Sequence, residues 1–223
     1  MKVCKAFCVV SLVLIWSAAG LAQDPVKVDA SHYKVLVDNP SVRVLKISYA
    51  PGSKSVMHQH PDSIVVPLSA SKVRFTTPDG KTEDSEMAAG SAQYSPAGTH
   101  NPANVGTTPV EAILVEFKAA APGTATLPTS RPNMEIKTLA EGPRGAAYHA
   151  TADANFAEPA GTKHDFDQVV IALNPGQISL SLDGKPAKTN WARGDVQFIG
   201  RGVAHESKNT GGKPFDFVVV AIK

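Results

Sequence analysis

The sequence predicts an all-β protein built from two copies of one small barrel, and three observations lead to this prediction. Short β-branched runs alternate with turns that contain glycine or proline. No segment carries the apolar stripe of an amphipathic helix. A stretch at 78–118 recurs in register at 182–223. Many short strands divided by such turns favour a sandwich or a barrel.

The repeat rests on residues that keep a constant spacing. Asp79-Gly80-Lys81 in the first copy corresponds to Asp183-Gly184-Lys185 in the second. The remaining matches pair Gly90 with Gly194, Gly98 with Gly202, His100 with His205, Asn104 with Asn209, Pro109 with Pro214 and Lys118 with Lys223. The offset of 104 becomes 105 after one inserted residue. Such a register is not expected by chance, so the chain holds two copies of one unit.

The individual strands follow from local patterns. Residues 42–49 alternate apolar and polar side chains, as a strand with one buried face does. The stretches 63–77 and 167–182 are β-branched runs that small or turn residues interrupt. The runs 110–117 and 215–222 are almost wholly apolar and each predicts a buried strand that closes its unit. The Asp-Gly dipeptides of the repeat predict tight hairpin turns.

Residues 1–22 have the pattern of a secretory signal peptide. Lys2 and Lys5 form a basic start, 9–16 is apolar except for one serine, and Gly20-Leu21-Ala22 supplies the small residues of a cleavage site. The apolar run is short for a membrane span. We expect cleavage after residue 22, no membrane span afterwards, and a periplasmic or secreted mature protein. An uncleaved N-terminal anchor is the alternative.

Removal of this segment changes the chemistry of the chain. Both cysteines, Cys4 and Cys8, lie within it, so the mature protein would have neither thiol nor disulfide. The whole chain has 22 basic and 20 acidic residues, and loss of Lys2 and Lys5 leaves 20 of each. A neutral chain without a basic block argues against nucleic acid as a partner.

The expected domain order is a signal peptide at 1–22, an N-terminal barrel at 23–118, a linker at 119–134 and a C-terminal barrel at 135–223. The linker range is rich in proline, threonine and alanine and has no period. It is either an extended connection or a segment that packs across both barrels.

Two motifs accompany the repeat: one occurs in both copies, and the other lies upstream of it in the first unit. The first copy has Gly90, Pro96, Gly98, His100 and Asn104. The second has Gly194, Gly200 in place of the proline, Gly202, His205 and Asn209. Upstream of the first copy stand Gly52, His58 and His60.

This set resembles the two motifs of the cupin family. The resemblance covers nearly the whole chain after residue 22 and implies a bicupin with two jelly-roll barrels. Cupins carry many unrelated activities, so it implies the fold more firmly than the function.

The sequence departs from the family pattern in its first motif. The family's glutamate is missing, because Ser63 stands at its place. In the second unit, His164 and Gln168 keep the histidine-to-glutamate spacing with glutamine as the replacement, and Thr162 stands where the first histidine would be.

Three histidines of the first unit are candidate metal ligands. On a strand His58 and His60 point to the same side, and the glycine-containing turn at 96–100 can bring His100 to them. Such a set would bind a divalent transition metal ion, whether Fe, Zn, Cu, Ni or Mn, and the absence of a carboxylate favours Zn, Fe or Cu over Mn. We expect no other cofactor. The alternative is a pair of exposed surface histidines at 58 and 60.

Further residues are expected near the ligands. Asp62, Ser63 and Tyr94 are candidates for positions just behind the histidines, where they could orient an imidazole or hold a water. Tyr94 could equally be an ordinary core residue.

The second unit offers a second candidate site in His164, Gln168 and His205. Two imidazoles and an amide hold a transition metal poorly. The alternatives are a degenerate barrel kept for packing or dimerisation, and a polar cluster that binds a small organic ligand. Asp165 and Asp167 flank His164, and one of them could replace the missing carboxylate.

Two functions follow. The first is an exported bicupin whose N-terminal metal serves an oxygenase-type or an isomerase/lyase-type reaction on a small organic substrate, with catalytic residues unassigned. The second is a non-catalytic bicupin that binds a small molecule or a protein partner. Since cupins frequently pair through sheet edges, a homodimer is one expected state. The sequence contains no Gly-x-Ser-x-Gly nucleophile turn and no phosphate-binding glycine loop.

Overall fold

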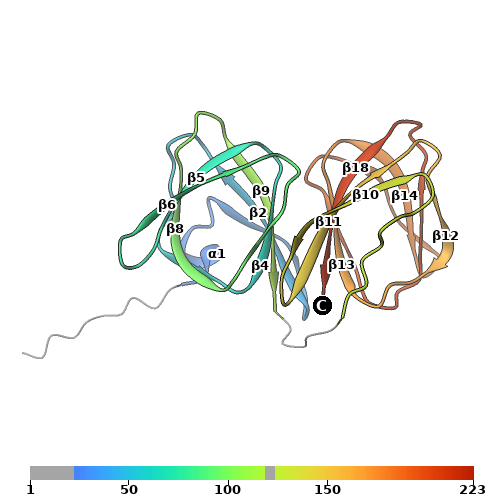
Figure 1. Ribbon diagram of the computed structural model, residues 1–223, viewed down its shortest axis with the longest axis horizontal. Coiled ribbons are helices and arrows are strands. Elements are labelled where there is room, and N and C mark those ends of the chain that lie inside the picture. Colours follow the sequence, from blue (N-terminus) through green and yellow to red (C-terminus); the bar gives the residue numbers. More distant parts are fainter. Residues whose placement is uncertain (1–22, 119–123) are drawn as a thin grey trace, which may run out of the picture.

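The computed structural model describes residues 23–118 and 124–223. The expected signal peptide and the first part of the expected linker lie outside these ranges. The described residues form two barrels side by side, and residues 124–133 run along one side of the second barrel (Figure 1).

The first barrel begins with one short helix and is otherwise made of strands. Helix α1 spans Pro25–Val28, with Asp24 accepting a hydrogen bond from Val26 N at its start. The strands are β1 (Tyr33–Asp38), β2 (Val42–Tyr49), β3 (His58–His60), β4 (Ser63–Pro67), β5 (Ser71–Thr76), β6 (Thr82–Met87), β7 (Gln93–Ser95), β8 (Gly98–Asn104) and β9 (Val110–Phe117).

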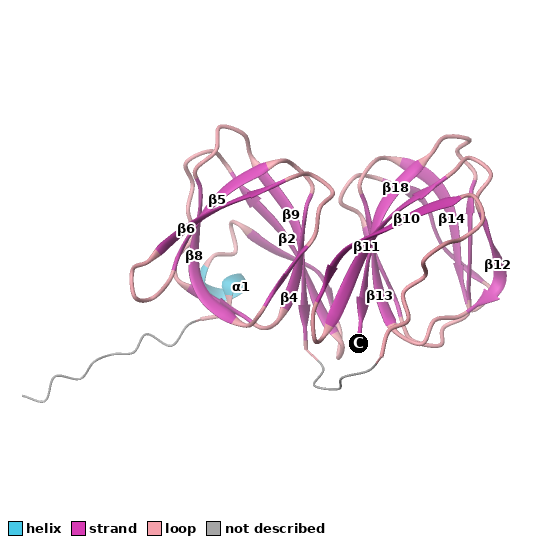
Figure 2. Ribbon diagram, viewed as in Figure 1, coloured by secondary structure: helices cyan, strands magenta, loops and turns pink. Residues whose placement is uncertain are grey.

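The second barrel repeats this series without a helix among its described residues (Figure 2). Its strands are β10 (Met134–Glu141), β11 (Gly145–Ala152), β12 (Ala157–Thr162), β13 (Asp167–Ala172), β14 (Gly176–Leu182), β15 (Lys185–Trp191), β16 (Val196–Ile199), β17 (His205–Asn209) and β18 (Phe215–Ile222). Strand β10 starts at Met134, the last residue of the expected linker range.

Each barrel consists of two sheets. In the first, the orders are β1-β2-β9-β4-β7 and β3-β8-β5-β6; in the second, they are β10-β11-β18-β13-β16 and β12-β17-β14-β15. The two barrels therefore have the same topology, with β10 to β18 equivalent to β1 to β9 in order. The predicted all-β fold of two tandem jelly-roll barrels is confirmed.

The central strands of the two five-stranded sheets, β9 and β18, are buried on both faces. On β9, Leu114 lies in the core of the first barrel, whereas Ile113 and Val115 belong to a cluster that also holds Val218 and Val220 of β18. We call this cluster the inter-barrel core. Its buried members are Val42, Val44, Ile64, Val66, Leu68, Ile113, Val115, Phe117, Ala147, Val169, Ile171, Val218, Val220 and Ile222. Burial on both faces explains why residues 112–115 and 217–222 are continuously apolar.

Besides the apolar cluster, the two barrels contact each other through a closely packed glycine and a hydrogen bond. A side chain at Gly145 would collide with the ring of Phe117, so glycine is required there. The Ser41 hydroxyl donates to the Asp167 carboxylate over 2.6 Å. Asp167, one of two candidates to replace the missing carboxylate, therefore lies at the junction of the barrels.

No described helix has the length and apolar character needed to cross a membrane.

Candidate metal centre in the N-terminal barrel

Strand pairing brings the three histidines of the first barrel together. Strand β3 pairs with β8 so that His58 lies opposite His100. His58 and His60 share the inner face of β3, and both are buried. The ring centroids are 4.8 Å apart for His58 and His60, 5.1 Å for His58 and His100, and 5.4 Å for His60 and His100. One ring nitrogen of each lies within 4.8 Å of the others, so the triad is positioned to hold a metal ion.

Hydrogen bonds on the far side of two rings determine where their protons lie. His58 Nδ1 is 2.8 Å from the Val56 carbonyl, and His60 Nδ1 is 2.6 Å from Glu116 Oε1. Both oxygens are acceptors, so in the neutral rings each Nδ1 carries the proton and each Nε2 carries a lone pair.

The two lone pairs point at each other. His58 Nε2 and His60 Nε2 are only 3.0 Å apart. Nitrogens bound to one ion through bonds of about 2.1 Å lie about 3.0–3.4 Å apart. The donor set therefore fits a divalent transition metal, which would relieve the repulsion between these atoms.

Burial keeps the ligand nitrogens unprotonated. It lowers the pKa of His58 to about 4, and the neighbouring His60 acts in the same direction. It lowers the pKa of His100 to about 3, again with help from the other two imidazoles. His58 and His100 are thus neutral at pH 7 and available to bind a metal.

A carboxylate stands behind the triad at a position that sequence reasoning missed. Glu116 on β9 is 1 % exposed and lies directly opposite Ser63 on β4. Besides His60, its carboxylate accepts from Arg43, whose guanidinium also pairs with Asp24. The acid that the family would place at Ser63 is therefore found on the adjacent strand, where it orients an imidazole.

Glu116 is held in its charged form. Burial by itself would raise the pKa of its carboxyl, but hydrogen bonds from His60 and Arg43 outweigh burial and lower it. The sequence signal for this residue is an acid that follows four consecutive apolar residues, 112–115, in a predicted buried strand.

A pair of tyrosine hydroxyls closes another side of the site. Tyr49 donates to the Tyr33 hydroxyl over 2.6 Å, and that hydroxyl is 3.0 Å from His58 Nε2. Burial raises the pKa of both phenols well above the usual value, so both stay protonated. Tyr33 thus donates to the lone pair of His58. Neither tyrosine was identified from the sequence.

Two of the expected neighbours of the ligands lie elsewhere. Asp62 accepts from the Tyr94 hydroxyl at 2.9 Å and from Ala97 N at 2.7 Å, and no hydrogen bond among the described residues joins it to a histidine. Tyr94 stacks on Phe117 at the inter-barrel face. These two residues shape the turn between β7 and β8. Ser63 is buried within β4 beside Glu116.

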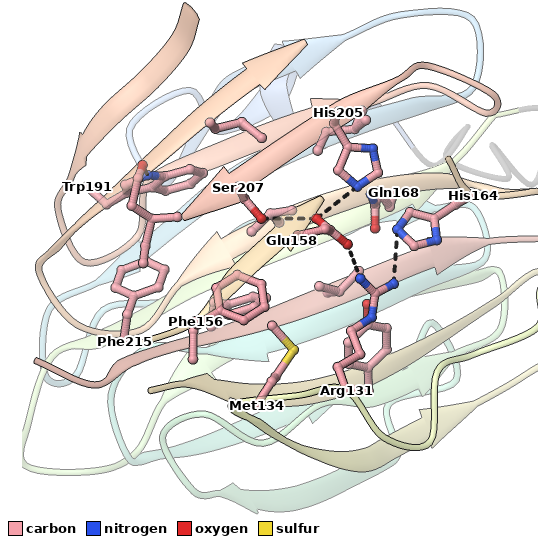
Figure 3. Close-up of a pocket in the computed structure, with 18 residues that line it drawn as sticks. Arg131, Met134, Phe156, Glu158, His164, Gln168, Trp191, His205, Ser207 and Phe215 are labelled. Carbon is pink, nitrogen blue, oxygen red and sulfur yellow. Dashed lines mark hydrogen bonds and ion pairs between the residues drawn. The ribbon is translucent and has the colours of Figure 1, made fainter. Parts of the chain in front are cut away.

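The second barrel gathers a different polar cluster. His164 and His205 lie with ring centroids 4.9 Å apart, and the acid beside them is Glu158, which sequence reasoning missed. Gln168 lines the same cavity, opposite Ala221. Arg131, from the segment before β10, pairs with Glu158 (Figure 3). Asp165 is exposed.

This cluster forms the polar end of a cavity of about 70 Å³. Ser207 adds a hydroxyl to that end, 3.0 Å from Glu158. The other end is apolar, and Met134, Phe156, Trp191 and Phe215 line it (Figure 3). The cavity therefore suits a small molecule with one polar and one apolar side.

The sequence and the structure were compared with known proteins. No family model matches the sequence. No curated protein matches it either.

Solved structures resemble it over both barrels. The crystal structure of AerE from Microcystis aeruginosa aligns with a TM-score of 0.65 at 15% identity, over 86% of this chain and 97% of that chain. A cupin 2 conserved barrel domain protein from Leptotrichia buccalis aligns with a TM-score of 0.56 at 12% identity, over 86% and 88%. A salicylate 1,2-dioxygenase from Pseudoaminobacter salicylatoxidans, in adducts with gentisate, aligns with a TM-score of 0.63 at 12% identity, over 86% and 74%. At such identities the likeness shows the fold, and this chain has the bicupin fold.

Proposed function

We propose that this protein is an exported bicupin enzyme that binds one divalent transition metal ion in its N-terminal barrel through His58, His60 and His100 and acts on a small organic substrate. The observation that carries the proposal is the convergence of three imidazoles in a buried site, with His58 Nε2 and His60 Nε2 3.0 Å apart and His100 beside them. Imidazole is the commonest metal ligand in proteins, and this spacing suits two nitrogens bound to one ion.

The ligand set favours some metals over others. Three neutral imidazoles suit Fe(II), Zn(II), Ni(II) or Cu(II) better than Mn(II). Glu116 accepts hydrogen bonds from His60 and Arg43. Its negative charge would therefore act on a metal indirectly, by making the His60 imidazole a more basic ligand. A bound ion would supply Lewis acidity or activation of dioxygen.

The protein itself contributes orientation, a proton and exclusion of water. Glu116 fixes the tautomer of His60, as the Val56 carbonyl does for His58. The Tyr33 hydroxyl keeps its proton at neutral pH. With a metal on His58 Nε2, its present acceptor, this hydroxyl would be free to donate a hydrogen bond to an oxygen atom of a substrate. Phe75, with its ring 5.0 Å from that of His100, shields one side of the site.

Among reaction classes, oxygenase-type chemistry is supported most. A site with three neutral ligands leaves coordination positions open, and one solved structure of the same fold is described as a salicylate 1,2-dioxygenase. Isomerase/lyase-type chemistry is the alternative within the same proposal.

Elemental analysis of protein purified without a histidine tag tests the metal site. We expect about one ion per chain, which His58→Ala and His100→Ala both remove. His149→Ala is the matched control, because His149 lies in the second barrel beside Asp216 and outside both clusters. A content far below one ion, unchanged by the substitutions, would refute the proposal.

Activity and export need separate measurements. Oxygen uptake by the metal-loaded protein with aromatic acids such as gentisate or salicylate would support the oxygenase class. N-terminal sequencing of protein from the culture medium or periplasm should begin at Gln23 if residues 1–22 are a cleaved signal peptide.

A non-catalytic small-molecule-binding role is a second candidate, and the cavity of the second barrel favours it. Its apolar end and its polar end lie within one pocket. Ligand-induced thermal shifts that Gln168→Ala abolishes, without turnover, would support this role. A metal-dependent activity that His60→Ala abolishes would speak against it.

A further inference from the structure

Arg131 enters the polar cluster of the second barrel from outside the repeat. It precedes β10, and its backbone pairs with Met134 in an isolated bridge. One nitrogen of its guanidinium contacts Glu158, and the other is 3.4 Å from His164 Nε2 (Figure 3). Because an arginine can only donate, His164 must present a lone pair to it. A single cation thus faces both a carboxylate and an imidazole lone pair.

The repeat shows that this cluster stands at the position of the first barrel's triad. His205 matches His100. Thr162 lies opposite His205 on paired strands, just as His58 lies opposite His100. One ligand atom each from Glu158, His164 and His205 lies within 4.8 Å of the others.

The charges of the cluster are already balanced. Glu158 is 8% exposed, and a buried carboxylate requires a partner. Arg131 provides a charge that persists at every accessible pH. A metal ion that bound both Glu158 Oε1 and His164 Nε2 would have to displace this guanidinium, which contacts both atoms, and would leave two positive charges side by side. As folded, the second barrel does not fit a metal.

We propose that Arg131 acts as a tethered cation that takes the place of a metal ion in the second barrel. Glu158, His164 and His205 then form a latent metal site, closed in the wild-type protein.

Removing the guanidinium should open the site. Arg131→Met retains much of the side-chain volume and removes the charge. Arg201→Met is the matched control, because Arg201 is exposed and its side chain forms no hydrogen bond or ion pair among the described residues. Both changes are made in protein that also carries His58→Ala and His100→Ala, so the result does not depend on the first site.

Zn²⁺ titration followed by calorimetry and elemental analysis gives the readout. We expect no tightly bound Zn²⁺ in the background protein or with Arg201→Met, and one ion per chain with Arg131→Met. Adding Glu158→Gln should abolish that ion. Zn²⁺ should also raise the melting temperature of the Arg131→Met protein alone, since a ligand that binds only the native state stabilises it. Absence of an added ion in folded Arg131→Met protein overturns the proposal.

A second measurement needs no change at Arg131. In otherwise wild-type protein, Glu158→Gln should leave the number of bound Zn²⁺ ions unchanged. Loss of one ion on this substitution would show that the second barrel already binds metal despite Arg131, and would also overturn the proposal.

Discussion

Replacement of Glu116 by glutamine tests how the fold supports the candidate metal centre. The change keeps the shape of the side chain but removes its charge, and it leaves one acceptor oxygen for two donors. In the native protein, His60 Nδ1 donates to one carboxylate oxygen and Arg43 to the other. In Glu116→Gln, one donor faces the amide NH₂ group and loses its partner.

The size of the effect follows from burial and from the remaining partners. Removing one member of a buried ion pair costs about 3–5 kcal/mol, and a hydrogen bond to a charged group contributes about 1.5–3 kcal/mol. Arg43 keeps its pair with Asp24 and is 17% exposed, so the loss lies near the lower end. We expect a decrease of about 3 kcal/mol in the free energy of unfolding of the metal-free protein, and a decrease of about 10- to 100-fold in metal affinity.

Two assays separate these effects. Urea unfolding in EDTA gives the stability of the metal-free protein, and Zn²⁺ titration by calorimetry gives the affinity. Glu83→Gln, an exposed change on β6, is the control and should alter neither. A Zn²⁺ affinity that stays within about twofold of wild type while stability falls would refute the role of Glu116 in orienting His60, and an unchanged stability would refute the buried network itself.

Three further predictions concern the surroundings of the site. Tyr33→Phe removes the acceptor of the neighbouring tyrosine hydroxyl, so urea unfolding should show a loss of about 1–3 kcal/mol, while Zn²⁺ should still bind, because this tyrosine is not one of the ligands; loss of the metal would contradict this. The pKa values of His58 and His100 are depressed in the folded protein, so on acidification the unfolded chain takes up protons first. The free energy of unfolding of the metal-free protein should therefore fall as pH drops from about 6.5 to about 4. A flat profile, or one that is the same in the His58→Ala/His100→Ala protein, would contradict this. Ile113→Ala removes a side chain from the inter-barrel core and should cost about 2–5 kcal/mol; unfolding followed by Trp191 fluorescence in the second barrel should shift with it, and an unshifted second barrel would show that the barrels unfold independently.

Local patterns predict a repeated all-β unit, and the resemblance to cupins adds the jelly-roll fold and the convergence of the three histidines. The two-residue period of a strand places His58 and His60 on one face, and the repeated motif locates His100 on an adjacent strand. These inferences need only spacing along the chain.

The supporting residues depend on pairing between distant strands. Glu116 lies beside Ser63 because β9 pairs with β4 in one particular register, which no local pattern reveals. Arg131 comes from outside the repeat, so comparison of the two copies could not indicate it. The run at 110–117 was expected to be buried, but a continuous apolar run does not tell which barrel each face contacts.

The inter-barrel core joins equivalent faces of the two repeated units, as a two-fold symmetric dimer interface would. A cut within the connecting segment would therefore not release two independent domains. Each half would present a wide apolar surface to water, and the best cover for it is the other half or a second copy of itself. Co-expressed halves should reassemble, and a half produced alone should form homodimers or aggregate. The covalent connection thus mainly ensures that two different barrels, rather than two identical ones, occupy the pair.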